Sequence, residues 1–242
     1  MSPIGDKGLV IVHVGDSGPL TAYDANTGNV KWTWNGVGPA FASPIIVELG
    51  GTRQVVTMTQ RSIVGVSVAD GALLWQHPWV SRMTPSASTP ILYGETIIVS
   101  GQAMGVTALK PARRDGKWAA GVMWETKDVS IFMSNPVLVR DTLFGLSERA
   151  SGQFFALDAK TGKVLWLGQS REAKNTAVAK AGDLLFLLND DAELIVARSS
   201  QTGFEPLKRY TVAGSATWAQ PAISGNRVFV KDVSSLALWT LN

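Results

Sequence analysis

The chain contains nearly the same short string three times. "LTAYDANTGNVKW" occupies residues 20–32, "FFALDAKTGKVLW" occupies residues 154–166, and the weaker "VGVSVADGALLW" occupies residues 64–75. In each copy the apolar residues predict a strand, an Asp and a Gly supply a turn, and a tryptophan follows that Gly by four residues. An isolated hairpin cannot bury an indole, whereas a repeated hairpin can dock each tryptophan on a neighbouring copy.

A second marker sets the phase of the repeat. Each repeat begins with a polar residue before a proline, or an alanine in one case, and a short apolar strand follows. These second residues are Pro3, Pro44, Pro90, Pro136, Ala177 and Pro221, which lie 41 to 46 residues apart. Each is followed by a turn and a second apolar strand before the hairpin described above. Four short strands in every such period are typical of a β-propeller.

We therefore expect an all-β fold: a β-propeller of six four-stranded blades in one domain, residues 1–242. The last blade ends at "LALWTLN" and lacks its outer strand, so 23 strands are expected. The predicted blades cover residues 1–41, 42–87, 88–133, 134–174, 175–218 and 219–242. The predicted structural docking residues are Trp32, Trp75, Trp124 and Trp166. In the fifth blade Leu207 or Tyr210 is expected in place of the tryptophan.

Composition excludes several classes of function. The chain has no cysteine, which excludes disulfides, thiolate metal sites and a cysteine nucleophile. Charged residues are only 17% and the net charge is +3. The densest basic group, residues 112–117, is expected to be a solvated loop, so no nucleic-acid partner is predicted. Neither a signal peptide nor an apolar run long enough for a membrane span is present in the sequence.

The string Ala-x-Asp-Ala-x-Thr-Gly-x-x-x-Trp, at residues 22–32 and 156–166 and partly at 65–75, resembles the tryptophan-docking motif of pyrroloquinoline-quinone-like (PQQ-like) propeller repeats. That superfamily includes quinone-dependent alcohol dehydrogenases, periplasmic scaffold lipoproteins of outer-membrane assembly, and many secreted bacterial proteins. Its propellers commonly have eight blades, so the resemblance implies a C-terminal portion of a longer propeller. It also implies a periplasmic or secreted parent, although the sequence itself indicates no compartment.

The resemblance does not predict a bound quinone. Quinone dehydrogenases of this kind are much longer than this chain, and many place an adjacent-cysteine disulfide against the cofactor. They also hold calcium with Glu, Asn and Asp ligands, and no such triad is recognisable here. We expect no cofactor, and PQQ least of all, although Ca²⁺ at oxygen ligands is possible.

Propeller geometry indicates where a ligand would bind. The loop before each first strand (the lead-in loop) and the loop between the second and third strands (the second loop) open on the same face. Lead-in candidates are Phe41, Ser134, Asn135, Lys174, Asn175, Trp218 and Gln220. Second-loop candidates are His13, Asp16, Gln60, Arg61, Gln102, Glu148, Arg149, Asp190, Asp191, Lys231 and Asp232. The predicted ligand-binding set is Arg61, Gln102, Glu148, Arg149, Asn175, Asp190, Trp218 and Lys231.

Three classes of function remain open. The first is a small-ligand or protein-binding module with a polar channel mouth. The second is a metal-dependent hydrolase of small esters, of lactonase or phosphotriesterase type, with Glu148, Asn175 and Asp190 as metal candidates. The third is a quinoprotein dehydrogenase remnant, which is less favoured than the hydrolase. The unpaired edge of the last blade also predicts a homo-oligomer, most simply a dimer through terminal blades.

Overall fold

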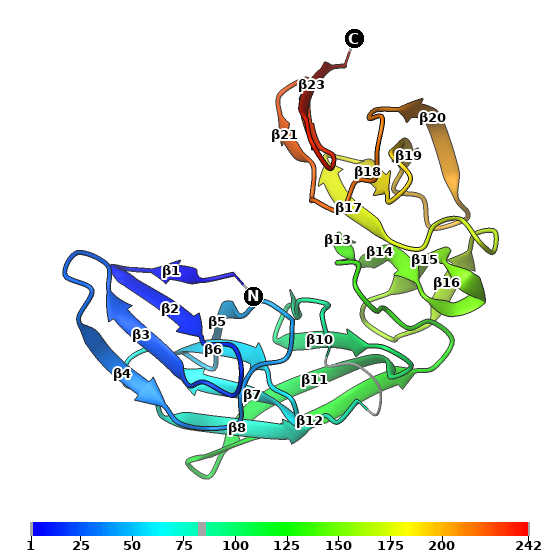
Figure 1. Cartoon of the computed structure of the whole chain (residues 1–242). Helices are drawn as coiled ribbons and strands as arrows, with labels where there is room; N and C mark the ends of the chain where they lie inside the picture. The colour runs from blue at the N-terminus through cyan, green and yellow to red at the C-terminus, as the bar shows by residue number, and fades with distance from the viewer. Residues whose placement is uncertain (1, 82–85, 242) are drawn as a thin grey trace. The chain divides into compact units, whose positions relative to one another are not determined.

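The computed structural model of the chain describes residues 2–81 and 86–241. Within them the strands form six antiparallel sheets, five of four strands and one of three, and the one helical element is a single 3₁₀ turn at Arg149–Ser151. Figure 1 shows these strands in chain order. The predicted all-β propeller of 23 strands, with an incomplete last blade, is confirmed.

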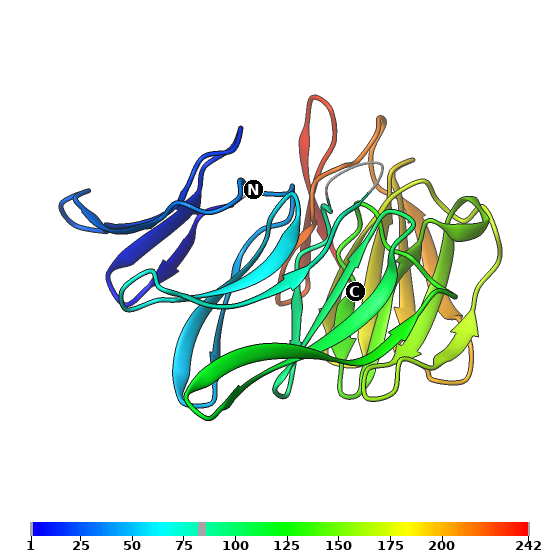
Figure 2. The same cartoon turned by 90° about the horizontal axis from the view of Figure 1, so that it is seen from below.

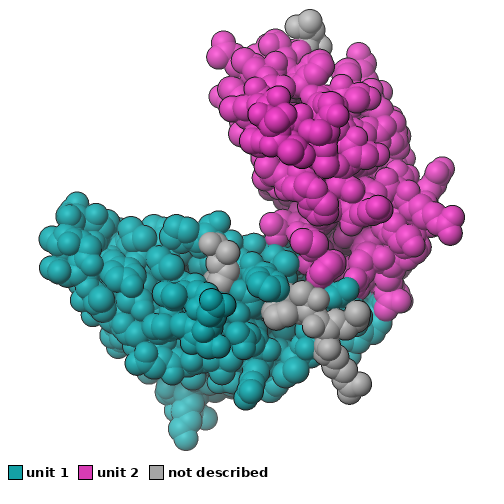
Figure 3. Space-filling view, viewed as in Figure 1, with its two compact units in different colours: residues 1–127 teal, residues 128–242 magenta. Residues whose placement is uncertain are grey.

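The first three sheets belong to unit 1, residues 1–127 (Figure 3). Sheet 1 holds β1 (Ile4–Asp6), β2 (Leu9–His13), β3 (Leu20–Asp24) and β4 (Val30–Trp34). Sheet 2 holds β5 (Ile45–Leu49), β6 (Thr52–Met58), β7 (Ser62–Ser67) and β8 (Leu73–Pro78). Sheet 3 holds β9 (Ile91–Tyr93), β10 (Thr96–Gly101), β11 (Gly105–Arg114) and β12 (Lys117–Thr126).

The other three sheets belong to unit 2, residues 128–242. Sheet 4 holds β13 (Val137–Val139), β14 (Thr142–Ser147), β15 (Gln153–Asp158) and β16 (Val164–Leu167). Sheet 5 holds β17 (Thr176–Ala181), β18 (Leu184–Asn189), β19 (Glu193–Arg198) and β20 (Glu205–Thr211). Sheet 6 holds β21 (Ala222–Ser224), β22 (Arg227–Lys231) and β23 (Leu236–Thr240). Leu236 and Leu238 on β23 are exposed, and the dimer through terminal blades stays a prediction.

The hydrophobic core lies between neighbouring sheets of each unit. In unit 1, Ile11 and Ala22 of sheet 1 form a buried cluster with Val55, Val64 and Val66 of sheet 2. In unit 2, clusters of buried residues join sheet 4 to sheet 5 and sheet 5 to sheet 6. Figure 2 shows the sheets of unit 2 side by side. Within each unit, neighbouring sheets thus bury apolar faces against one another.

A β-bulge recurs at the same place in all five four-stranded sheets, between the third and fourth strands. In the first four sheets the residue before the bulge is Ala or Gly, and it lies opposite Trp32, Trp75, Trp124 or Trp166. In sheet 5 Val196 lies opposite Lys208. The expectation that Leu207 or Tyr210 replaces the tryptophan is therefore wrong, because the bulge shifts the register by one residue.

Two of the repeated tryptophans join their sheet to the next one. The indole N–H of Trp32 donates to the carbonyl of Val68 at 2.8 Å, and that of Trp166 donates to Ser200 at 2.8 Å. Trp75 is buried but donates within its own sheet, to the side-chain oxygen of Gln54 at 2.7 Å. Trp32, Trp75 and Trp166 therefore act as packing and hydrogen-bonding residues of the blades.

The Asp of the motif builds the turn before Trp32 and before Trp166. One carboxylate oxygen of Asp24 accepts the backbone N–H groups of Asn26 and Thr27, both at 3.0 Å. The Thr27 bond, with the Lys31 ammonium, lowers the pKa of Asp24 to about 2. Asp158 accepts the N–H groups of Lys160 and Thr161 in the same way. These carboxylates are occupied by turn formation.

Candidate binding face

Lead-in loops and second loops come together within each unit. In unit 1 the backbone N–H of Gln60 donates to the carbonyl of Gly38 at 3.0 Å. In unit 2 Glu148 donates to Ser130 at 2.8 Å, and Asp190 donates to Asn175 at 3.0 Å. The two loop sets therefore share one end of the sheets in each unit, as the propeller pattern predicts.

Asp190 is the centre of the loop contacts in unit 2. One of its carboxylate oxygens accepts the backbone N–H groups of Lys174 at 3.1 Å and Asn175 at 3.0 Å. Its backbone carbonyl accepts the N–H of Thr217, from the lead-in loop of the next sheet, at 3.2 Å. The side chain of Asn175 in turn accepts a bond from the Ser134 hydroxyl at 2.9 Å. Asp190 and Asn175 thus hold three lead-in loops together.

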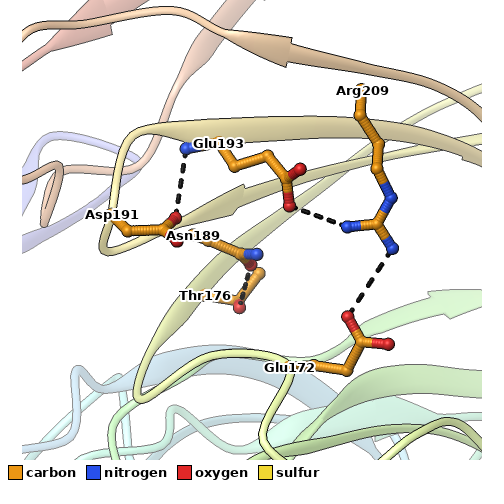
Figure 4. Close-up of polar contacts among 6 residues, drawn as sticks. All are labelled: Glu172, Thr176, Asn189, Asp191, Glu193 and Arg209. Atoms are coloured by element: carbon orange, nitrogen blue, oxygen red, sulfur yellow. Dashed lines mark hydrogen bonds and ion pairs between the residues drawn. The ribbon is translucent and has the colours of Figure 1, made fainter.

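Asn189, directly before Asp190, is a fully buried polar residue in the same network. Its side-chain oxygen accepts the hydroxyl of Thr176 at 2.6 Å (Figure 4), and its backbone carbonyl accepts the hydroxyl of Thr217 at 2.6 Å. Its amide nitrogen has no partner among the described residues. Buried polar groups are costly unless they are hydrogen-bonded. The side-chain oxygen of Asn189 is therefore used to anchor the loop, and it is not free to bind a ligand.

An ion-pair group lies beside this network and was not predicted from the sequence. Arg209 on β20 contacts Glu193 on β19 at 2.7 Å and Glu172 in the lead-in loop at 3.6 Å (Figure 4). The Glu172 side chain is only 11% exposed. The pairing links the outer strand of sheet 5 to the segment that precedes β17, and a pair of this exposure contributes at most about 1 kcal/mol. Glu172, Glu193 and Arg209 are far apart in the sequence, so no sequence pattern predicts that their side chains are in contact.

The eight predicted ligand-binding residues differ in their surroundings. Arg61, Arg149, Trp218 and Lys231 are exposed, whereas Gln102, Glu148, Asn175 and Asp190 are partly buried. The structure brings Asn175 and Asp190 into direct contact, and their hydrogen bonds tie the loops to one another. The Lys231 ammonium bonds to the carbonyl of Asp232 in its own loop. Arg61 and Gln102 lie on different sheets of unit 1.

A metal ion or a quinone would need a dedicated set of side chains. Among residues 2–81 and 86–241, no group of three or more His, Asp or Glu side chains is arranged to hold a metal ion. Of the three predicted metal candidates, Asp190 and Asn175 each use a side-chain oxygen in the loop network. The quinone-binding residues of the dehydrogenases are not matched either, because the chain has no vicinal cysteines. We derive no reaction step through either group.

Unit 1 carries a groove of about 490 Å³ where the second loop of sheet 1 meets the lead-in loop of sheet 2. Its lining includes His13, Val14, Asp16, Pro39, Phe41 and Gln60. His13 is 3% exposed, and burial lowers the pKa of its imidazole to about 4. Its Nδ1 lies 3.3 Å from the Thr57 hydroxyl, and its Nε2 has no partner among the described residues. The ring is therefore neutral at neutral pH.

Large apolar side chains recur at one position of the lead-in loops. Phe41, Met133 and Trp218 each precede the repeat proline by three residues, and they are 62%, 49% and 57% exposed. Phe41 and Trp218 were named from the sequence, and Met133 was missed because a single methionine carries no pattern of its own. Phe41 belongs to unit 1, whereas Met133 and Trp218 belong to unit 2. Within each unit, exposed apolar side chains on these loops are typical of an interaction surface.

The structure has no helix long and apolar enough to cross a membrane, within the residues that it describes.

A comparison with the curated proteins found no match. The crystal structure of BamB from Moraxella catarrhalis is similar, with a TM-score of 0.54 and 17% identity over 97% of this chain and 80% of that one. The computationally designed Ika8 protein is similar at a TM-score of 0.51 and 12% identity, covering 99% of this chain and 95% of that one.

These structural matches agree with the propeller fold. The decisive match is to a protein family, because the model described as outer membrane protein assembly factor BamB matches residues 1–168. That range includes all three tryptophan hairpins in full, residues 20–32, 64–75 and 154–166. The chain belongs to the BamB-type family of PQQ-like propeller proteins.

Proposed function

We propose that the chain is a protein-binding module whose lead-in loops contact a partner, and that it acts by binding rather than by chemistry. The observation that carries this proposal is the exposure of Phe41, Met133 and Trp218 at one repeat position. Such side chains are costly to leave in water and gain most when a partner covers them. An aromatic residue that is preordered on a rigid loop also loses little entropy on binding.

The polar residues of the unit 2 loops support the same conclusion. Asp190, Asn175 and Ser134 form bonds between the loops that carry Met133 and Trp218, so their oxygens order these two loops. A loop set that is already ordered costs less to bind than a flexible one. In unit 2, the polar network therefore orders the loops that present the exposed apolar side chains.

The partner that we propose is a component of an outer membrane protein assembly machinery, in a bacterium. The family description supports this class of partner. Binding of a small ligand is the alternative for the same loops. A metal-dependent hydrolase is less favoured, because no group of three or more His, Asp or Glu side chains in the described residues is arranged to hold a metal ion.

Site-specific photo-crosslinking tests this proposal in the source cell. A photoreactive phenylalanine analogue would replace Phe41, Met133 or Trp218 one at a time, and Val30 on β4, which is 58% exposed, would be the matched control. We expect crosslinks to an assembly component from the three loop positions and none from the control. Equal crosslinking at Val30, or products only with unrelated proteins, would contradict the proposal.

A further inference from the structure

The groove of unit 1 is preformed by close contacts between two loops. Gly38 packs against Ser17 so tightly that a Cβ atom at Gly38 would lie 2.2 Å from the Ser17 Cα. The Gly38 carbonyl also accepts the N–H of Gln60, and the N–H of Ala40 donates to Met58 at 3.0 Å. The loop that carries Phe41 is therefore held at a fixed position beside the loop that carries Asp16.

The side chains that line this groove have one formal charge. Asp16 supplies a carboxylate at the exposed turn of the second loop, where its φ of +53° places the residue in the left-handed region. The buried His13 does not oppose a cation, because its pKa of about 4 leaves the imidazole neutral. Arg61 follows Gln60 in the chain and is exposed, but it does not line the groove.

The apolar part of the groove suits a long side chain. Val14 and Pro39 present hydrocarbon surface, and the Phe41 ring is more than half exposed. Aliphatic stems of arginine and lysine pack on such surface while the charged head stays at the rim. An aromatic face attracts a cation, and a planar guanidinium stacks on it better than an ammonium does.

We infer that this groove binds an arginine side chain of the partner protein, with its stem along Val14 and Pro39 and its guanidinium between the Asp16 carboxylate and the Phe41 ring. The inference rests on the proposed function and specifies one contact of the same binding face. The Asp16 carboxylate gives the groove its preference for a positive charge. The exposed Phe41 contributes both to this groove and to the apolar surface of the lead-in loops.

An NMR titration of the whole chain tests the inference without a partner. The probes are N-acetyl-L-arginine methylamide and its uncharged isostere N-acetyl-L-citrulline methylamide. We expect the arginine probe to shift the amide signals of Gly15, Asp16 and Phe41, and to bind several-fold more tightly than the citrulline probe. Equal affinity of the two probes, or shifts elsewhere on the chain, would overturn the inference.

Asp16→Asn is the informative variant, because Asn tolerates positive φ and keeps the shape of the side chain. It should weaken the arginine probe about two- to fivefold, the range expected for an exposed charge pair. Asp115→Asn is the matched control, since Asp115 is also exposed, with φ of +49° at the tip of the β11–β12 hairpin. Equal loss in both variants would count against the groove.

The two proposals fail separately. Crosslinking of the lead-in loops to a partner without arginine binding would refute only the arginine pocket. Arginine binding without any crosslinked partner would refute the protein-binding function and leave the pocket as a site for a small cationic ligand.

Discussion

Replacing Trp166 by alanine should cost the fold about 3–5 kcal/mol of unfolding free energy, the usual range for a buried large aromatic residue. The Trp166 ring packs 6.2 Å from the centre of Phe144 and 5.9 Å from that of Phe204, and its N–H bonds to Ser200. That hydrogen bond contributes about 1 kcal/mol, and each aromatic pair about 0.5–1.5 kcal/mol. Because the residue is only partly buried, the lower end of the range applies.

Urea unfolding followed by circular dichroism measures this effect. Trp166→Phe keeps most of the ring packing and removes the hydrogen bond, so it should cost about 1 kcal/mol. Trp218→Ala is the matched control, because Trp218 is exposed and its replacement should change stability by less than about 0.5 kcal/mol. A loss below about 1 kcal/mol for Trp166→Ala would show that the indole does not join sheets 4 and 5.

Three further predictions concern the loops and the cofactor. The pKa of His13 is about 4 in the folded chain and about 6.5 in the unfolded chain, so the unfolded chain binds the proton more readily. The free energy of unfolding should therefore fall by about 3 kcal/mol from pH 7 to pH 4. Urea titrations of His13→Gln should show a smaller decline over the same pH range. Gly38→Ala forces a Cβ onto Ser17 and should destabilise by about 1–3 kcal/mol, whereas Gly214→Ala, with open space around it, serves as control; equal melting temperatures would refute the close contact. Pyrroloquinoline quinone with calcium should produce neither a thermal shift nor alcohol-dependent dye reduction, and a stoichiometric shift would contradict this expectation.

The repeat allowed the strands to be predicted because two independent markers have the same period. The residues from Pro3 to Pro221 mark each first strand, and the Asp and Gly of the hairpins mark the last turn. Both are local backbone effects, so they are visible in the sequence. The bulges are not, since a one-residue shift in pairing depends on the partner strand, and this is why Lys208 was missed.

The sequence predicts which loop carries each candidate residue, but it does not predict what the side chain of that residue contacts. Loop membership follows from strand phase, and the structure brings Asp190 and Asn175 of two such loops into contact. Whether a polar side chain faces a ligand or bonds to a neighbouring loop depends on contacts between repeats, which no local pattern records. The same reason explains why the Arg209 pair with Glu172 appeared only in the structure.

Hydrogen exchange on the complex with the crosslinked partner tests the binding face most directly. The account predicts slower exchange in the lead-in loops, residues 35–44, 128–136 and 213–221, when the partner is added. The hairpin turns at residues 24–29 and 158–163 are the internal reference, since they lie between the third and fourth strands, and their exchange should not change. Protection of these turns, with the lead-in loops unaffected, would contradict the account.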